Sequence, residues 1–184
     1  IIGNPNVGKS TLMNALVGER LSIITSKAQT TRHRILGIVN DKQHQIVFSD
    51  TPGVMNPAYK LQENMMDFVH GAFQDADILL YMVETGEKQL KDEKLFERLK
   101  NTDLPILLLL NKIDRVEQDF VKEQILFWKE LLPNAEIYPI SALNKFNLDL
   151  VMVRIKALLP LSPPYFEKDA LTDKSERFFV SETI

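Results

Sequence analysis

Residues 3–10 read GNPNVGKS, and no other segment limits the possible folds of this chain so strongly. They match the pattern G-x-x-x-x-G-K-[ST] in full. Two apolar residues precede the loop, and residues 12–17 follow it with helical spacing. In this context the glycines let backbone N–H groups turn inward around an anion, and the start of the helix adds its partial positive charge. The motif therefore predicts a phosphate-binding loop between a strand and a helix.

The loop assigns a role to each of its residue types. Lys9 is expected to span the β- and γ-phosphates of a nucleotide, and Ser10 to offer its hydroxyl to Mg²⁺. The other residues expected to contact the nucleotide here are Asn4, Pro5, Asn6, Val7, Gly8 and Thr11.

Strand-like and helix-like segments alternate through the rest of the chain. Two β-rich runs on either side of DKQH, at 35–40 and 45–50, predict an antiparallel hairpin. Continuous apolar runs at 77–83 and 104–114 are typical of strands covered on both faces. A further strand is expected at 135–143, and helices at about 61–74, 87–101, 117–131 and 147–159.

This alternation predicts an α/β fold of the P-loop NTPase type. We expect a mostly parallel six-stranded sheet with one antiparallel edge strand and helices on both faces. With 184 residues, 45% of them hydrophobic, the chain can form one substantial core. We therefore expect one domain over 1–160, followed by a proline-containing linker over 161–184.

Both ends of the sequence suggest a fragment of a longer protein. Only Ile1 and Ile2 precede the phosphate loop, so we expect most of the preceding strand to be missing. At the other end, residues 172–184 (TDKSERFFVSETI) predict helix-capping residues and the first turns of another helix.

Composition excludes several classes of protein. The 22 basic and 25 acidic side chains nearly balance, so the chain lacks the strongly basic character of a nucleic-acid binder. It has no cysteine, which excludes disulfides and zinc–thiolate sites. No apolar run reaches the length of a membrane span and no signal peptide opens the sequence, so we expect a soluble cytoplasmic protein.

A second motif, DTPGV at 50–54, follows an apolar strand. In an open α/β sheet, ligands bind at the carboxyl ends of the strands. Asp50 can hold Mg²⁺ through water there, and Gly53 can offer its N–H to a γ-phosphate. In the polar loop 22–34, Thr30 and Thr31 are both candidates for the hydroxyl that completes the Mg²⁺ site, and we favour Thr31.

The third motif, NKID at 111–114, points to guanine as the base. The Asp114 carboxylate can accept hydrogen bonds from guanine N1–H and N2–H₂ together, an arrangement that adenine does not offer. Lys112 is expected to lay its stem along the purine, and Asn111 to tie this loop to the phosphate loop. Around Ser141, Ala142 and Leu143 we expect a further contact, with the Ala142 N–H at guanine O6.

With these motifs in order, the sequence resembles the Era family of GTPases, within the TrmE-Era-EngA-like group related to translation factors. The resemblance lies in GNPNVGKSTLMNAL, KAQTTRHRILGI, DTPGV and NKID and covers essentially the whole chain; QTTRHRI is its most specific part. SERFF at 175–179 resembles the stretch where these GTPases pass into an RNA-binding KH domain, which is absent here.

The resemblance implies a GTP-binding, slowly hydrolysing molecular switch that uses Mg²⁺ and acts in small ribosomal subunit assembly. The family binds 16S rRNA and the pre-ribosomal particle through the absent domain. It also implies a monomer and peripheral association with the inner face of the cell membrane. The alternatives are the domain of a related tRNA-modifying or tandem ribosome-assembly GTPase, and a nucleotide-gated binding module with little catalysis.

Val54 stands where many GTPases place a glutamine that orients the attacking water, and it has no hydrogen-bonding group. A partner or a distant side chain could supply the missing group, or the phosphate loop and Mg²⁺ could suffice for slow turnover. In related GTPases with GxPNxGKS loops, the asparagine binds a potassium ion. By that resemblance Asn6 is a K⁺ ligand; its alternative role is to stabilise the turn. We expect Lys9, Asn6, Thr31 and Gly53 at the catalytic centre.

Overall fold

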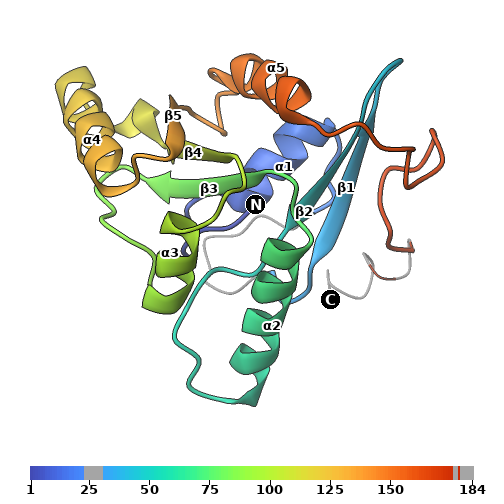
Figure 1. The fold of residues 1–184 in the computed structure, drawn as a ribbon, viewed down its shortest axis with the longest axis horizontal. Helices are drawn as coiled ribbons and strands as arrows, with labels where there is room; N and C mark the ends of the chain where they lie inside the picture. Colours follow the sequence, from blue (N-terminus) through green and yellow to red (C-terminus); the bar gives the residue numbers. More distant parts are fainter. Residues whose placement is uncertain (23–30, 176–177, 179–184) are drawn as a thin grey trace.

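The computed structural model describes residues 1–22, 31–175 and 178. Figure 1 shows strands and helices alternating along the chain in these ranges. The helical elements are α1 (Lys9–Val17), α2 (Lys60–Gln74), α3 (Glu93–Lys100), η1 (Ile113–Arg115), α4 (Gln118–Leu131) and α5 (Leu148–Leu158). The strands are β1 (Ile35–Asn40), β2 (Gln45–Asp50), β3 (Leu79–Glu84), β4 (Ile106–Asn111) and β5 (Ala135–Pro139).

The strands pair in two groups. β3, β4 and β5 are parallel, and β1 and β2 form the predicted antiparallel hairpin with Ile35 opposite Asp50. Residues 1 and 2 lie between the groups: Ile1 N donates to Ser49 O at 2.7 Å, and Ile2 forms a parallel bridge with Tyr81. The described part of the chain thus has five strands and a two-residue bridge where six strands were predicted.

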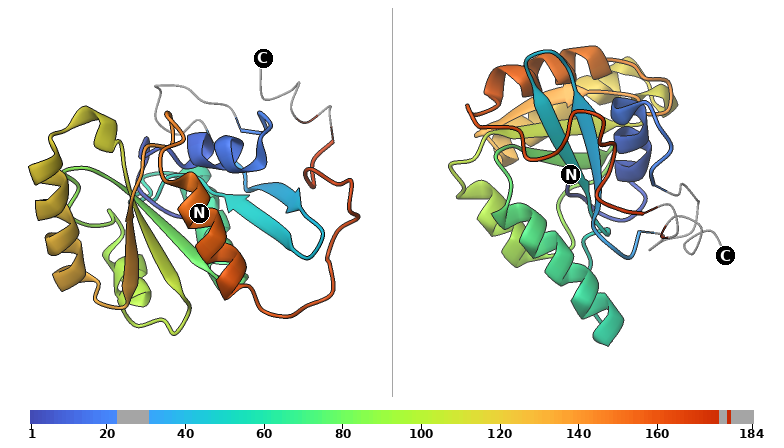
Figure 2. Two further views of the ribbon diagram at one scale, coloured as in Figure 1. Left: turned by 90° about the horizontal axis from the view of Figure 1, so that it is seen from above. Right: turned by 90° about the vertical axis from the view of Figure 1, so that its right-hand side faces the viewer.

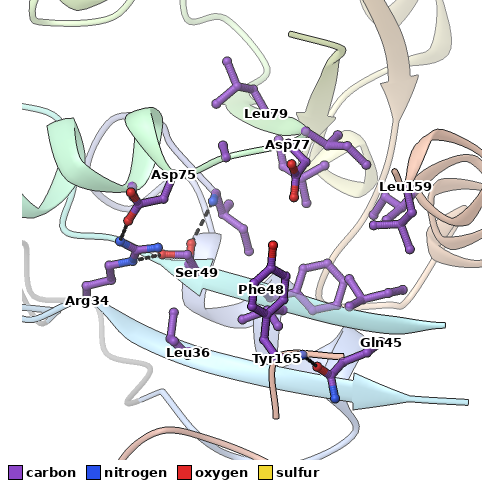
Figure 3. Close-up of a pocket in the computed structure, with 18 of the residues that line it drawn as sticks. Arg34, Leu36, Gln45, Phe48, Ser49, Asp75, Asp77, Leu79, Leu159 and Tyr165 are labelled. Atoms are coloured by element: carbon purple, nitrogen blue, oxygen red, sulfur yellow. Dashed lines mark hydrogen bonds and ion pairs between the residues drawn. The ribbon is translucent and has the colours of Figure 1, made fainter. Parts of the chain in front are cut away.

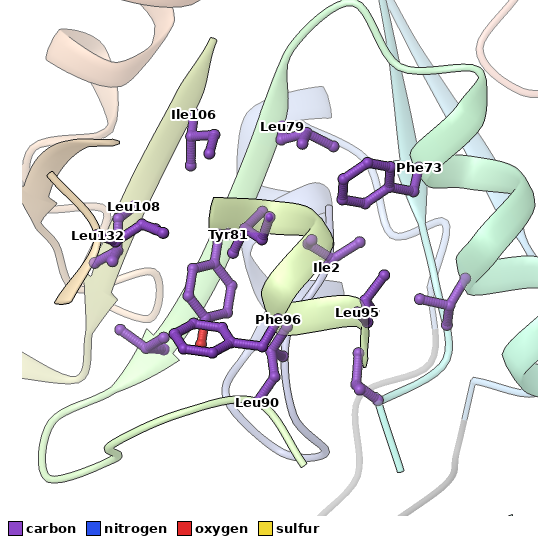
Figure 4. Close-up of a cluster of buried hydrophobic side chains, with 14 of the residues drawn as sticks. Ile2, Phe73, Leu79, Tyr81, Leu90, Leu95, Phe96, Ile106, Leu108 and Leu132 are labelled. Carbon is purple, nitrogen blue, oxygen red and sulfur yellow. The ribbon is translucent and has the colours of Figure 1, made fainter. Parts of the chain in front are cut away.

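Helices cover both faces of the parallel strands, as predicted (Figures 1 and 2). Alternate residues of β3 and β4 contribute to two separate hydrophobic clusters. Tyr81 and Leu108 belong to the cluster with α2, α3 and α4, of which Figure 4 shows a part. Met82 and Leu109 belong to the cluster with α1 and α5. The two apolar runs in the sequence are therefore continuous because both of their faces are buried.

The helices follow the predicted ranges except for α3. It begins at Glu93 instead of residue 87, because the Asp92 side chain caps it by accepting from Leu95 N at 3.0 Å. Leu90, which has the helical spacing, is buried but lies in the preceding loop. α1 ends at Val17, the last residue with the predicted helical spacing, and Gly18 caps it with φ 84°. No helix within the described ranges is both long and apolar enough to cross a membrane.

Residues after α5 return to the domain and run beside β1 (Figure 1). Ile38 N donates to Leu171 O at 2.9 Å, and the Gln45 side chain accepts from Tyr165 N at 2.7 Å. The expected linker therefore contacts both strands of the hairpin, at Ile38 of β1 and Gln45 of β2. The helix predicted from the last residues falls almost entirely outside the described residues.

A cavity of about 570 Å³ lies between β2 and β3 (Figure 3). The end of α2, α5 and residues 165–166 complete its walls. Arg34 lies on its border, where Nε donates to Ser49 Oγ at 2.7 Å and Nη1 pairs with Asp75 at 2.5 Å. None of the three nucleotide motifs lines this cavity, although residues 1 and 2, which precede the phosphate loop, do.

Candidate nucleotide-binding site

The phosphate loop requires glycine at two positions because the backbone passes very close to its neighbours. A Cβ on Gly3 would lie 2.2 Å from Met82 O, and one on Gly8 would lie 2.5 Å from Asn111 Nδ2. Gly8 also has φ 105°, and Asn6 has φ 64°. Positive φ is tolerated by glycine and, among other residues, most readily by asparagine. The loop thus turns as the motif predicts and leads directly into α1.

Lys9 is buried at the start of α1. Its Nζ donates to Asn4 O at 2.9 Å and to Gly3 O at 3.2 Å. Burial lowers the pKa of Lys9 from 10.5 to about 8, and the carboxylates of Asp50 and Glu87 oppose this shift. A cation held under a loop of backbone N–H groups is suited to a polyphosphate, whose negative charge would favour the protonated form.

The three residues predicted to bind Mg²⁺ lie together. Ser10 Oγ donates to Asp50 Oδ2 at 2.7 Å and is 3.1 Å from Thr31 Oγ1. Asp50 is fully buried, and its Oδ1 has no hydrogen-bond partner among the residues that the structure describes. Two hydroxyls and a carboxylate with a free oxygen are ligands that Mg²⁺ prefers, so these residues fit that ion. Thr30, the other candidate, lies outside the described residues.

Ser22 was missing from the sequence prediction of this cluster. It is 1% exposed, and its hydroxyl donates to Asp50 Oδ2 at 2.8 Å. Asn14 Oδ1 accepts from Ser22 N at 2.9 Å and holds the backbone here. A serine in a polar loop carries no motif, so nothing in the sequence indicated this contact.

The NKID segment ends β4 and reaches the phosphate loop as predicted. Asn111 Nδ2 donates to Val7 O at 2.7 Å. Its Oδ1 accepts from Ala142 N at 2.9 Å, so the N–H expected at guanine O6 is used within the protein. Ser141 is buried beside it and Leu143 is exposed. The asparagine side chain therefore joins three loops.

The two other polar residues of NKID differ in their surroundings. Lys112 has φ 65°, and its Nζ forms an ion pair with Glu84 Oε2 at 2.5 Å. Glu84 is the last residue of β3 and lies opposite Asn111 in the parallel register. Its proximity to the NKID loop could therefore have been inferred from the two predicted parallel strands. Asp114 lies in η1 and is exposed, which leaves its carboxylate accessible to a base.

The DTPGV segment packs against the phosphate loop. A Cβ on Gly53 would lie 2.6 Å from Pro5 Cα, and Val54 N donates to Gly3 O at 3.0 Å. The Val54 side chain is fully buried in the hydrophobic core, so it faces away from any bound phosphate. Where many GTPases have a water-orienting glutamine, this chain thus has a valine that packs in the core.

The two asparagines of the phosphate loop have different environments. The Asn4 side chain is buried and bonds to residues 87–91, so it is turned away from the nucleotide side of the loop. Asn6 is exposed, and its side chain forms no hydrogen bond within the described part of the chain. Its left-handed backbone shapes the turn while its amide stays accessible.

The loops that follow β2, β4 and β5 carry polar groups able to bind a ligand, and they meet beside the phosphate loop that precedes α1. This arrangement, on a parallel sheet with helices on both faces, defines the fold of a P-loop GTPase. Residues 1–112 match the model of the 50S ribosome-binding GTPase family, and the chain belongs to that family.

The family model matches only residues 1–112, whereas individual relatives align with the whole chain. It is 41% identical over 185 aligned residues to GTPase Era of Clostridium botulinum, and 40% identical to GTPase Era of Alkaliphilus metalliredigens. These alignments cover all of this chain but only 62% and 63% of the relatives. The chain thus spans less than two thirds of their length.

Solved structures give the same result. The structure of Era in complex with MgGDPNP and nucleotides 1506–1542 of 16S ribosomal RNA superimposes with a TM-score of 0.92 and 37% identity. A variant of Aquifex aeolicus Era bound to GDP and AlF4⁻ gives the same two values. Both comparisons cover 98% of this chain and 62% of the other.

Proposed function

We propose that this chain is the GTPase domain of a molecular switch that binds GTP with Mg²⁺ and hydrolyses it slowly to GDP and phosphate. The observation that carries the proposal is the 2.7 Å hydrogen bond from Asn111 Nδ2 to Val7 O. This bond fixes the distance between the NKID loop, which would bind guanine, and the phosphate loop. One nucleotide can bind to both loops only if that distance is fixed.

Each motif then has a role at a stated atom. Lys9 Nζ binds the β- and γ-phosphates, and the Gly53 N–H donates to the γ-phosphate. Ser10, Thr31 and Asp50 would hold Mg²⁺, which neutralises negative charge on the phosphates when it is bound. The Asp114 carboxylate accepts from the guanine edge.

Hydrolysis has to proceed without a glutamine, because Val54 is buried. We assign Asn6 as the ligand of a potassium ion, supported by its accessible amide and by the GxPNxGKS loop of related GTPases. Potassium should then raise the rate of GTP hydrolysis above that in sodium, at matched Mg²⁺ and ionic strength. Equal rates in the two salts would eliminate Asn6 from this role and leave a partner group, or the phosphate loop and Mg²⁺ alone.

We propose that a strand preceding Ile1 fills the cavity between β2 and β3. The 2.7 Å bond from Ile1 to Ser49 and the bridge from Ile2 to Tyr81 set the direction of such a strand, parallel to β3.

By family resemblance, residues 1–160 form the GTPase domain, 161–184 a linker, and an RNA-binding KH domain follows. A cytoplasmic monomer with peripheral membrane contact remains a prediction from that resemblance.

The proposed partner is the small ribosomal subunit. The similar Era structure contains a segment of 16S rRNA, whereas the family description names the 50S subunit. The more similar protein carries more weight here. Co-sedimentation of the full-length protein with purified 30S and 50S subunits, in GDP and in a non-hydrolysable GTP analogue, separates the two partners.

Affinities for GTP, GDP and ATP measured side by side test the nucleotide assignment. We expect both guanine nucleotides to bind at least about a hundredfold more tightly than ATP, because two hydrogen bonds to Asp114 are lost with adenine. Equal binding of ATP and GTP would contradict the guanine site. Tight GTP binding without phosphate release would favour a binding module over an enzyme.

A further inference from the structure

The side chain of Asn4 connects the phosphate loop to the segment that begins at the last residue of β3. We call residues 84–91 the brace loop. Asn4 Nδ2 donates to Glu87 Oε1 and to Gln89 O, both at 3.0 Å, and Asn4 Oδ1 accepts from Lys91 N at 3.0 Å. Both amide hydrogens and the amide oxygen are thus used, and Asn4 is only 5% exposed.

Glu87 is held in place from its other side. Its Oε2 accepts from Glu84 N at 2.9 Å, and its own N–H donates to Glu84 O at 3.0 Å. Burial raises the pKa of Glu87, and the hydrogen bonds from Glu84 N–H and Asn4 oppose that shift. A partly desolvated carboxylate with two fixed donors holds its partners more firmly than an exposed one.

Asn4 also contacts the cation of the phosphate loop. Its backbone oxygen accepts from Lys9 Nζ at 2.9 Å, while its side chain bonds to Glu87. The position of that oxygen therefore depends on the brace loop, and Glu87 can act on Lys9 through Asn4 without touching a nucleotide.

The brace loop is anchored at the guanine side as well. Thr85 N donates to Asn111 O at 3.2 Å, and Glu84 Oε2 pairs with Lys112 Nζ at 2.5 Å. Gly86 N donates to Gln124 Oε1 on α4 at 3.1 Å. The loop is therefore a fixed support and not a free surface turn.

We propose that Glu87 is a positioning residue of the nucleotide site: by fixing the Asn4 side chain, it holds the phosphate loop and Lys9 in the geometry that receives the nucleotide phosphates. This inference rests on the proposed function. A loop that adopts the binding geometry only part of the time binds more weakly in proportion to that fraction.

Exchanging donor and acceptor between the two residues tests the proposal. In Glu87→Gln, the new amide cannot accept from both Asn4 and Glu84 N–H. In Asn4→Asp, two carboxylates face each other. In the double variant, the amide oxygen of the introduced glutamine can accept from Glu84 N–H while its nitrogen donates to the carboxylate introduced at position 4. The pairing between positions 4 and 87 is then restored, while the bond from position 4 to Gln89 O stays lost, as it is in Asn4→Asp.

The measurement is the GDP affinity of the full-length protein, together with its thermal midpoint. We expect each single variant to bind GDP about tenfold more weakly. The double variant, which still lacks the bond to Gln89 O, should bind GDP at least about threefold more tightly than Asn4→Asp. Glu93→Gln, the same change at an exposed position on α3, is the matched control and should bind like wild type.

Two results would overturn the inference: Glu87→Gln with wild-type GDP affinity, even at a lowered thermal midpoint, or a double variant that binds no better than Asn4→Asp. The first would show that Glu87 supports only the fold. If the wild-type protein itself bound no guanine nucleotide, the proposed function would fail and this inference with it.

Discussion

The hydroxyl of Ser22 donates to Asp50 Oδ2 at 2.8 Å, the same oxygen that accepts from Ser10. Two hydroxyls thus fix one oxygen of the buried carboxylate and leave the other, Oδ1, without a partner in the described part of the chain. An oriented acceptor of this kind is suited to a cation beside the phosphates.

Ser22→Ala should therefore weaken magnesium-dependent nucleotide binding. Asp50 would keep Ser10 but lose one of the bonds that orient it, so we expect about a threefold to tenfold loss of GDP affinity in Mg²⁺. Titration with GDP in Mg²⁺ and in EDTA measures the effect. Ser162→Ala, in the exposed segment after α5, is the control. An equal loss with and without Mg²⁺ would contradict a role at Asp50.

Lys9→Ala should abolish tight nucleotide binding without unfolding the protein. The lysine is the cation of the phosphate loop, and we expect GDP affinity to fall at least about a hundredfold. Its folded pKa, about 8, lies below the ordinary 10.5, so folding disfavours the charged form. The variant also loses the bonds from Nζ to Asn4 O and Gly3 O, so its thermal midpoint without nucleotide shows whether it still folds.

Calorimetric titration with GDP and thermal unfolding check the two parts separately. Lys94→Ala, on the exposed side of α3, is the matched control. Retained micromolar affinity in Lys9→Ala would mean that another group binds the phosphates.

The sequence predicted the elements and motifs well because each has a local physical cause. Gly3 is required because a Cβ would lie 2.2 Å from the backbone oxygen of Met82, and Gly8 is favoured by its φ of 105°. Asn111 reaches Val7 O because both lie at one edge of the sheet. The two apolar strands were identifiable because both of their faces are buried.

The contacts missed were those between side chains far apart in sequence. Asn4 was expected at the nucleotide, yet its side chain bonds to Glu87, 83 positions away. The predicted start of α3 was wrong. Leu90 has helical spacing with the apolar residues of α3, but the Asp92 side chain caps the helix, which begins at Glu93. Such choices depend on tertiary contacts, which single-sequence periodicity does not contain.

Asp114→Asn should change the preferred base from guanine to xanthine. The amide nitrogen would donate where the carboxylate accepts, which matches the carbonyl of xanthine and repels guanine N2–H₂. With two hydrogen bonds affected, we expect a loss of GDP affinity of about a hundredfold and a gain for XDP. Competition between GDP and XDP measures the exchange. Asp149→Asn, exposed at the start of α5, should leave selectivity unchanged; unchanged selectivity in Asp114→Asn would show that another group reads the base.

Gly53→Ala should separate binding of GTP from binding of GDP. The added Cβ would lie 2.6 Å from Pro5 Cα and 2.7 Å from Pro5 N, which are backbone atoms that cannot rotate away. The segment around Gly53 must then move off the phosphate loop, and the bond from Val54 N to Gly3 O would lengthen. Because the proposed γ-phosphate donor is the Gly53 N–H, the affinity for a non-hydrolysable GTP analogue should fall about tenfold or more, and GDP affinity much less.

Gly71→Ala is the matched control for this change. Gly71 lies within α2, and a Cβ there would meet nothing within 4 Å. Alanine should stabilise that helix by up to about 1 kcal/mol without changing either affinity. If Gly53→Ala lowered the affinities for GDP and the analogue by the same factor, the substitution would be acting on the phosphate loop as a whole, and Gly53 would have no separate part in sensing the γ-phosphate.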